Sequence, residues 1–184
     1  VLAGAWHAMQ RDADAIVMIL AADHHISDAS AFRKAVDEAA EAARRGKIVT
    51  FGIKPAFPAT GYGYILPGEA IPGTTCALVA RFREKPARDV AESYILEGCL
   101  WNSGNFLVKA KTLAEHAKAF VPDIWQSVSS ACEQGTFEAG IRRPDEAAYA
   151  ATKKISFNYA IMEKTTEAAV KSVAYDWSDI GTWD

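Results

Sequence analysis

The stretch of sequence that decides the fold class is IVMILAADHHI, residues 16–26, in which a short apolar run ends in three polar residues. Such a run, rich in branched side chains, is typical of a strand covered on both faces, so we expect a central strand over residues 16–22. Residues 29–45 follow with apolar side chains at helical spacing, and residues 47–53 (KIVTFGI) form a second strand-like run. This order predicts a layered α/β domain in which the helix connects the two strands by a right-handed parallel crossover.

The rest of the chain continues the alternation of helices and strands. Four of the seven prolines lie in residues 54–74, which indicates a loop and a turn around a short strand near residues 62–66. We expect a returning strand at residues 76–83, a strand at 105–109 and a last strand at 168–174. Helices are expected at residues 1–11, 87–97 and 112–120, and another opens with Pro122 in its first turn. Residues 135–152 have no clear pattern.

Composition excludes several classes of protein. A chain of 184 residues fits one domain of ordinary size. Its 20 Lys and Arg against 23 Asp and Glu give a net charge of −3, with no basic run longer than two residues, so no nucleic-acid partner is expected. The longest apolar run, residues 15–22, is far shorter than the roughly 20 residues of a membrane span. Cys76, Cys99 and Cys132 have no metal-ligand spacing, which favours free thiols in a cytoplasmic protein.

The polar residues after the first strand are the first candidates for a functional site, because ligands of open α/β sheets bind beyond the carboxyl ends of strands. The Asp23 carboxylate is suited to Mg²⁺, or it caps the following turn. A zinc site at His24 and His25 is disfavoured, because neighbours on an extended backbone point to opposite sides. His7 and His116 are remote in sequence.

Other candidate segments combine glycines with polar side chains. They are TGYGY (60–64), EKP (84–86), WNSG (101–104) and WSDIGTWD (177–184), the last of which resembles a loop in which aromatic residues flank Asp179. Each alone is a weak signal and is better explained as a turn, a loop or a strand exit. The sequence contains no GxGxxG, GxxxxGK[ST] or GxSxG motif. These absences argue against a dinucleotide oxidoreductase, a P-loop enzyme and a serine hydrolase.

Six motifs in order nevertheless resemble one family, the mannose-1-phosphate guanylyltransferases among the sugar-phosphate nucleotidyltransferases. They are LAADHHI (20–26), FGIKPAFPATGYGYI (51–65), FREKP (82–86), LWNSGNFLV (100–108), SFNYAIMEKT (156–165) and WSDIGTW (177–183). The resemblance implies a Rossmann-like nucleotide-diphospho-sugar transferase fold, a mixed and mostly parallel sheet with helices on both faces.

The family's glycine-rich nucleotide-binding loop, of the type GxGxRLxPLS, has no counterpart in residues 1–184. By this resemblance the chain is expected to be the central part of a single nucleotidyltransferase catalytic domain, without the N-terminal loop and without a C-terminal domain. We therefore expect residues 1–184 alone to be inactive, because the loop supplies amides that hold the triphosphate.

The reaction that the resemblance implies joins mannose 1-phosphate to the α-phosphorus of GTP, giving GDP-mannose and pyrophosphate. The attacking phosphate oxygen is already ionised at neutral pH, so no general base is required, and catalysis depends on charge neutralisation and positioning. By similarity, Asp23 and Asp179 would hold Mg²⁺, and Lys85 would contact the sugar phosphate.

Sugar recognition, again by similarity, would involve a carboxylate, amides and a backbone position. One residue departs from the family, which typically has S-[IV]-D-Y-A where this chain has SFNYA, so an uncharged amide replaces a carboxylate. The substrate-binding residues expected from the resemblance are Gly61, Glu84, Asn102 and Asn158.

Two alternatives remain open. A related sugar-1-phosphate nucleotidylyltransferase would use another base or sugar, and the base-reading loop lies outside this chain. A non-catalytic sugar-nucleotide-binding homologue would belong to a different class, and the presence of Asp23, Lys85 and Asp179 argues against it. The resemblance also leaves a homo-oligomer possible.

Overall fold

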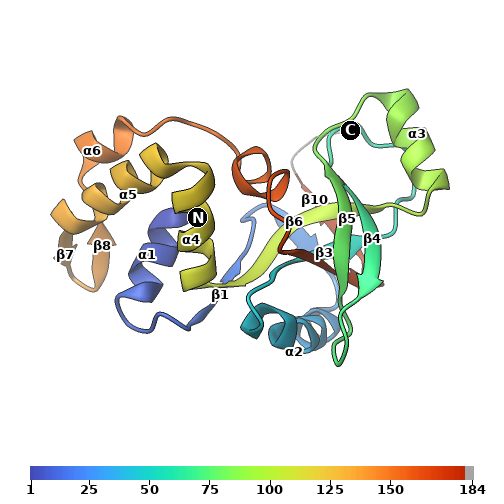
Figure 1. The fold of residues 1–184 in the computed structure, drawn as a ribbon, viewed down its shortest axis with the longest axis horizontal. Coiled ribbons are helices and arrows are strands. Elements are labelled where there is room, and N and C mark those ends of the chain that lie inside the picture. Colours follow the sequence, from blue (N-terminus) through green and yellow to red (C-terminus); the bar gives the residue numbers. More distant parts are fainter. Residues whose placement is uncertain (181–184) are drawn as a thin grey trace. The chain divides into compact units, whose positions relative to one another are not determined.

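The structure is a computed structural model and describes residues 1–180 (Figure 1). Residues 181–183, the end of the WSDIGTW motif, lie outside the described residues. The chain forms two compact units. Unit 1 contains Val1–Val17 and Lys109–Thr165, and unit 2 contains Met18–Val108 and the chain from Thr166 onward. Within residues 1–180 no helix combines the length and the apolar character needed to cross a membrane.

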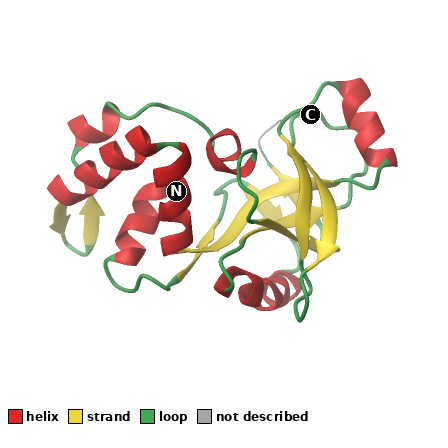
Figure 2. Ribbon diagram, viewed as in Figure 1, coloured by secondary structure: helices red, strands yellow, loops and turns green. Residues whose placement is uncertain are grey.

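Unit 1 is mainly helical (Figure 2). The helices expected near the N-terminus, at residues 112–120 and after Pro122 are confirmed, and the first of them packs against the other two. The stretch without a clear pattern forms a small hairpin and a short helix. The elements are α1 (Leu2–Met9), α4 (Ala110–Phe120), α5 (Pro122–Gln134), β7 (Thr136–Glu138), β8 (Ile141–Arg143), α6 (Glu146–Ala150) and the π-helix η1 (Asn158–Met162).

Unit 2 is built around a sheet with the strand order β1-β6-β3-β9-β5-β4 and a separate two-stranded ladder of β2 and β10. Helix α2 packs against β3 and β9, and α3 packs against β4. The elements are β1 (Ile16–Ile19), β2 (His24–Ile26), α2 (Ala29–Arg44), β3 (Ile48–Ile53), β4 (Tyr64–Ala70), β5 (Ala77–Arg83), α3 (Arg88–Leu96), β6 (Leu100–Lys109), β9 (Ala168–Val173) and β10 (Trp177–Asp179). The first two residues of β1 and the last residue of β6 are counted in unit 1.

The α/β class is confirmed and the sheet is mixed, but the expectation of mostly parallel strands is wrong. Strand β3 pairs in parallel with β9, whereas the pairs β3–β6, β4–β5, β4–β6 and β5–β9 are antiparallel. The connection from β4 to β5 is a tight turn in which the Ile71 amide donates to the Cys76 carbonyl at 2.9 Å. A connection this short permits only antiparallel pairing, since parallel neighbours need a crossover of about a dozen residues.

Strand β1 is not central, contrary to expectation. In the described part of the chain it stands at one end of the strand order, and all four of its residues are half-buried. Strand β6 lies between β1 and β3, so helix α2 does not join neighbouring strands. The buried centre is β3, in which every residue from Ile48 to Ile53 is buried.

Strands β4 and β6 are longer than the sequence suggests. Proline and glycine usually interrupt a strand, but here Pro67 lies inside β4 and Gly104 inside β6. Pro67 stands in β4 at a shift of register against β5, where a missing amide donor is tolerated. Gly104 has φ +75° inside β6, at the irregular stretch of its pairing with β3. The Trp-Asn-Ser-Gly segment, expected to precede a strand, is therefore part of one.

Helix α2 shows how local sequence positions the neighbouring elements. The Asp28 carboxylate accepts hydrogen bonds from the amides of Ser30 and Ala31, both at 2.9 Å, and so caps the helix. At the other end Gly46 adopts φ +86°, the left-handed conformation in which glycine commonly ends a helix.

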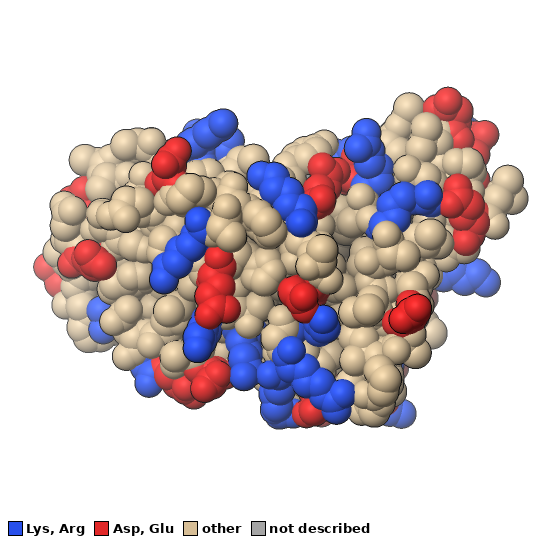
Figure 3. Space-filling model, in the orientation of Figure 1, with Lys and Arg blue, Asp and Glu red and all other residues tan. Residues whose placement is uncertain are grey.

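On the face drawn in Figure 3, acidic and basic side chains are interspersed.

Candidate functional site

The two aspartate-containing motifs meet in the ladder of β2 and β10, although His24 and Trp177 are 153 residues apart in sequence. The strands are antiparallel, with Asp179 opposite His24, and the Ile180 amide donates to the Asp23 carbonyl at 2.9 Å. The WSD segment, expected to be a loop, is thus a strand. The ladder places Asp23 and Asp179 at neighbouring positions in the fold.

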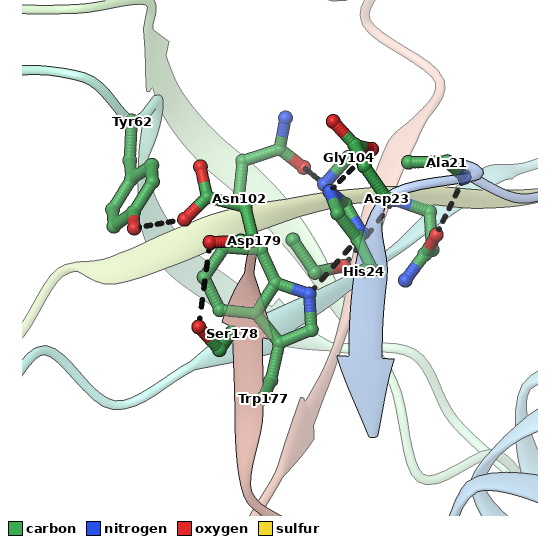
Figure 4. A network of polar contacts seen from close by, with 11 residues as sticks. Ala21, Asp23, His24, Tyr62, Asn102, Gly104, Trp177, Ser178 and Asp179 are labelled. Atoms are coloured by element: carbon green, nitrogen blue, oxygen red, sulfur yellow. Dashed lines mark hydrogen bonds and ion pairs between the residues drawn. The ribbon is translucent and has the colours of Figure 1, made fainter. Parts of the chain in front are cut away.

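Tyr62 holds the Asp179 carboxylate. Its hydroxyl donates a hydrogen bond to Asp179 Oδ1, as Figure 4 shows. The Tyr62 ring makes edge contacts with Trp177 and Trp101, with centroid distances of 5.3 and 5.0 Å. Asp179 is half-buried, whereas the Asp23 side chain is 67% exposed. One carboxylate is therefore fixed by the protein and the other faces solvent.

His24 lies next to both aspartates and is oriented by Trp177. The indole Nε1–H donates to His24 Nδ1 at 3.3 Å, so Nδ1 is the acceptor and a neutral ring carries its proton on Nε2. His24 Nε2 lies 4.0 Å from Asp23 Oδ1. On the other side, a Cβ at Gly104 would lie 3.5 Å from His24 Cε1. The imidazole of His24 is therefore oriented by its hydrogen bond with Trp177 and packs close to Gly104.

Glu84 and Asn102 form a buried polar corner around Gly63, with exposures of 8% and 5%. The backbone N–H of Asn102 donates a hydrogen bond to the Gly63 carbonyl at 2.8 Å. A Cβ at Gly63 would lie only 2.7 Å from Glu84 Oε2. Asn102 Oδ1 accepts hydrogen bonds from Thr50 Oγ1 at 2.6 Å and from the Gly104 amide at 3.3 Å. Hydrogen bonds thus hold the Asn102 side chain in place before any ligand binds, and the buried Glu84 carboxylate lies close to the Gly63 backbone.

Lys85 stands beside this corner but in a different environment. Lys85 is exposed to solvent whereas the adjacent Glu84 is buried. Its backbone has φ +44°, an uncommon conformation for a residue with a side chain, and its amide donates to the Tyr62 carbonyl at 3.2 Å. This hydrogen bond fixes the backbone of Lys85 next to Tyr62.

The remaining expected residues are Gly61 and Asn158. Gly61 is exposed, and a Cβ at this position would meet no atom within 4 Å, so its backbone is open to approach. Asn158 is the first residue of η1 in unit 1, whereas the other six expected residues belong to unit 2.

Sequence reasoning missed the roles of three residues in this arrangement. Tyr62 had a visible signal, since it is an aromatic hydroxyl between two glycines of the TGYGY segment. The sequence presents His24 only as a candidate zinc ligand, and Trp177 only as an aromatic neighbour of Asp179. Their hydrogen bonds depend on the β2–β10 ladder, which local pattern does not reveal.

Two further tyrosines of unit 2, Tyr64 and Tyr175, have raised pKa values. Burial raises the pKa of Tyr64, whose hydroxyl donates to the Ala59 carbonyl at 3.0 Å. Burial also raises the pKa of Tyr175 to about 12. Both phenols are therefore protonated at neutral pH, as tyrosine also is at its ordinary pKa.

The comparisons with known proteins agree with this geometry. The whole chain, residues 1–184, matches the family described as Nucleotidyl transferase. It is 43% identical to the mannose-1-phosphate guanylyltransferase ManC of Salmonella typhimurium, over 94% of this chain and 37% of the relative. It is 41% identical to the xanthan biosynthesis protein XanB of Xanthomonas campestris pv. campestris (strain B100), over 100% of this chain and 39% of the relative.

A solved structure is also similar. The crystal structure of a mannose-1-phosphate geranyltransferase from Thermus thermophilus superposes with a TM-score of 0.87 at 31% identity, over 99% of this chain and 51% of that one. The chain spans less than two fifths of the length of the two curated relatives, 37% and 39%. Sequence, family match and fold agree that the chain belongs to the nucleotidyl transferase family.

Proposed function

We propose that this chain is part of the single catalytic domain of a mannose-1-phosphate guanylyltransferase, which makes GDP-mannose and pyrophosphate from GTP and mannose 1-phosphate. The observation that carries the proposal is the β2–β10 ladder, which brings the Asp23 and Asp179 motifs together. Tyr62 is hydrogen-bonded to the Asp179 carboxylate and to the backbone amide of Lys85. The similarity to enzymes of that name supports the choice of substrates.

In the proposed reaction a phosphate oxygen of the sugar phosphate attacks the α-phosphorus of GTP. The new O–P bond forms as the bond from that phosphorus to pyrophosphate breaks, and the leaving group takes the electron pair. No side chain has to remove a proton from an ionised phosphate. The exposed Lys85 ammonium would instead neutralise charge on the sugar phosphate, a task suited to a compact cation.

The acidic residues fit a magnesium ion. Asp23 offers an exposed carboxylate and Asp179 a carboxylate that Tyr62 orients, and hard oxygen ligands are what Mg²⁺ prefers. Within residues 1–180 no group of three or more His, Cys, Asp or Glu side chains could hold a metal alone. Mg²⁺ usually takes one or two carboxylates together with substrate phosphates, and when bound it would supply charge neutralisation at the reacting phosphates.

Sugar recognition is assigned in the proposal to Glu84, Asn102, Asn158 and the backbone at Gly61. The buried corner of Glu84 and Asn102 supports this, because buried polar groups that meet the wrong sugar would lose a partner at a cost of about 1–3 kcal/mol. Asn158 would contribute a neutral amide. The three free thiols, all buried, suit the cytoplasmic location that we also propose.

The test is pyrophosphate release by the full-length protein with GTP and mannose 1-phosphate, measured across a magnesium titration. Asp23→Asn and Asp179→Asn should lower turnover and raise the Mg²⁺ concentration needed for it. Lys85→Met should lower kcat/KM for mannose 1-phosphate with little change in Tm. Asp37→Asn, at an exposed position on α2, is the matched control and should leave turnover, the magnesium requirement, kcat/KM and Tm unchanged.

Other outcomes would overturn the proposal. Preferred turnover of another nucleoside triphosphate or sugar phosphate would favour the related nucleotidylyltransferase. Binding of sugar nucleotides without turnover would favour the non-catalytic homologue. An unchanged magnesium dependence in both aspartate variants would contradict the metal assignment.

A further inference from the structure

Unit 1 contains a cavity of about 350 Å³ that the proposed function does not use. It lies between the last turn of α1 and the β7–β8 hairpin. The hairpin turns at Ala139 and Gly140, with φ +49° and φ +80°, and a Cβ at Gly140 would meet nothing within 4 Å, so this side of the cavity is open. The lining residues are His7, Ala8, Gln10, Arg11, Phe137, Gly140 and Arg142.

The cavity has basic side chains and no acidic ones in its lining. Arg11 comes from the end of α1 and Arg142 from β8, and neither makes an ion pair with a carboxylate in residues 1–180. Arg45 and Arg81, by contrast, are paired with glutamates. Arg33, Arg83 and Arg143 also form no ion pair in residues 1–180, so what distinguishes Arg11 and Arg142 is that both line the same cavity. Two guanidinium groups thus line one cavity without a carboxylate to neutralise them.

The acids nearest in sequence do not supply that neutralisation. Asp12, next to Arg11, accepts a hydrogen bond from the Asp14 amide at 2.9 Å. Glu138 follows Phe137 on β7 and is not part of the lining, as expected for neighbours on a strand, whose side chains point to opposite faces. Arg142 stacks over the Phe137 ring at 4.8 Å, which fixes its direction while leaving its N–H donors available.

His7 is the third basic group of the cavity. Its ring packs edge-on against Trp6 at 5.0 Å, and its Nδ1 is buried with no hydrogen-bond partner. Burial lowers the pKa of His7, and the charges of Arg142 and Arg11 lower it further. The imidazole therefore reports the local charge, because an anion between the arginines would oppose their effect on its pKa.

We propose that the cavity lined by His7, Arg11 and Arg142 is an anion site for the phosphoryl group of a small phosphorylated compound. The planar guanidinium fork matches phosphate oxygens and binds them in pairs, which favours a phosphoryl group over a halide. The cavity volume accommodates a phosphoryl group with part of the molecule that carries it, and the half-exposed Phe137 ring lies at its edge. The site is independent of the proposed reaction, since its residues are not among those assigned to it.

The experiment uses the full-length protein with ¹³C-labelled histidine in magnesium-free buffer, and inorganic phosphate as the probe. The His7 ring signal is assigned with His7→Asn, so the measurement reports this cavity and not phosphate bound elsewhere. We expect phosphate to shift the His7 signal in a saturable manner and to raise its pKa. Acetate at the same concentrations should produce no saturable shift.

Arginine variants provide the decisive comparison. Arg142→Met and Arg11→Met should each weaken phosphate binding about tenfold, the equivalent of about 1.4 kcal/mol for one charged partner. Arg143→Met is the matched control, because Arg143 is the next residue on β8, is also exposed, and does not line the cavity. Equal weakening in Arg143→Met would reduce the effect to general surface charge and overturn the proposal. An equal response to acetate, or no response of His7 to phosphate, would also overturn it.

Discussion

At Tyr62 a single residue contacts three parts of the proposed active site. Its hydroxyl donates to Asp179, its carbonyl accepts the Lys85 amide and its ring packs against Trp177. A hydrogen bond to a carboxylate is stronger than one between neutral groups, at about 1.5–3 kcal/mol. Tyr62 therefore acts as a positioning residue for Asp179.

Tyr62→Phe tests this role at the scale of one atom. The variant keeps the ring contacts and removes the donor, so kcat of the full-length protein should fall about tenfold, which corresponds to about 1.4 kcal/mol of lost transition-state stabilisation. The magnesium concentration for half-maximal rate should rise in the same kinetic measurement. Tm should change little.

Tyr64→Phe is the matched control for that experiment. It removes a buried hydroxyl that donates to the Ala59 carbonyl, away from Asp179. We expect a lower Tm with kcat and magnesium dependence retained. If Tyr62→Phe behaved like Tyr64→Phe, with full kcat and only a lower Tm, the positioning role would be refuted.

At the scale of elements, α2 connects the site ladder to the core of the sheet. Strand β2 ends at Ile26 and the helix begins at Ala29, so the Asp28 cap lies directly between them. The helix then packs against β3 and β9, with Phe32 and Phe51 at a ring distance of 6.0 Å. The position at which the helix begins therefore fixes where the chain leaves β2.

Asp28→Ala should lower the free energy of unfolding by about 1 kcal/mol, because the amides of Ser30 and Ala31 lose their acceptor. Urea denaturation monitored by circular dichroism measures the change. Asp37→Ala, on the exposed face of the same helix, is the comparison and should be neutral or slightly stabilising because alanine favours helix. Equal losses in both variants would show that the cap bonds contribute nothing.

At the scale of the whole molecule, all three cysteines are free and buried. Burial raises the pKa of the Cys76, Cys99 and Cys132 thiols, although Lys171 opposes the shift at Cys76 and Arg81 opposes it at Cys99. A raised pKa leaves less thiolate at a given pH, and the thiolate is the reactive form. Reactivity should therefore depend on opening of the fold.

Iodoacetamide labelling at pH 8 should modify these three cysteines slowly in the native full-length protein and rapidly in guanidinium chloride. Peptide mass spectrometry resolves the three rates separately. Raising the pH should speed native labelling, because it increases the thiolate fraction. Native labelling of any one of them at the denatured rate would contradict burial of that thiol.

Local sequence was sufficient where one segment determines its own structure. The apolar run of β3 and the helical spacing of α2 depend on neighbouring residues only, and both elements lie where they were predicted. The six motifs also indicated the family, since they retain their order and spacing along the chain. Asp23, Lys85, Glu84, Asn102 and Asp179 could be selected for the same reason.

Tertiary structure alone decided which segments pair. The edge position of β1, the antiparallel direction of most strand pairs and the strand character of WSD follow from hydrogen bonds between distant segments. The bond from Tyr62 to Asp179 joins residues 117 apart in sequence. The periodicity of a sequence indicates which faces of a segment are buried, but it carries no information about which other strand completes the backbone hydrogen bonds. The sequence by itself therefore determined the elements and the family. The pairing of strands in the tertiary structure decided the geometry of the site.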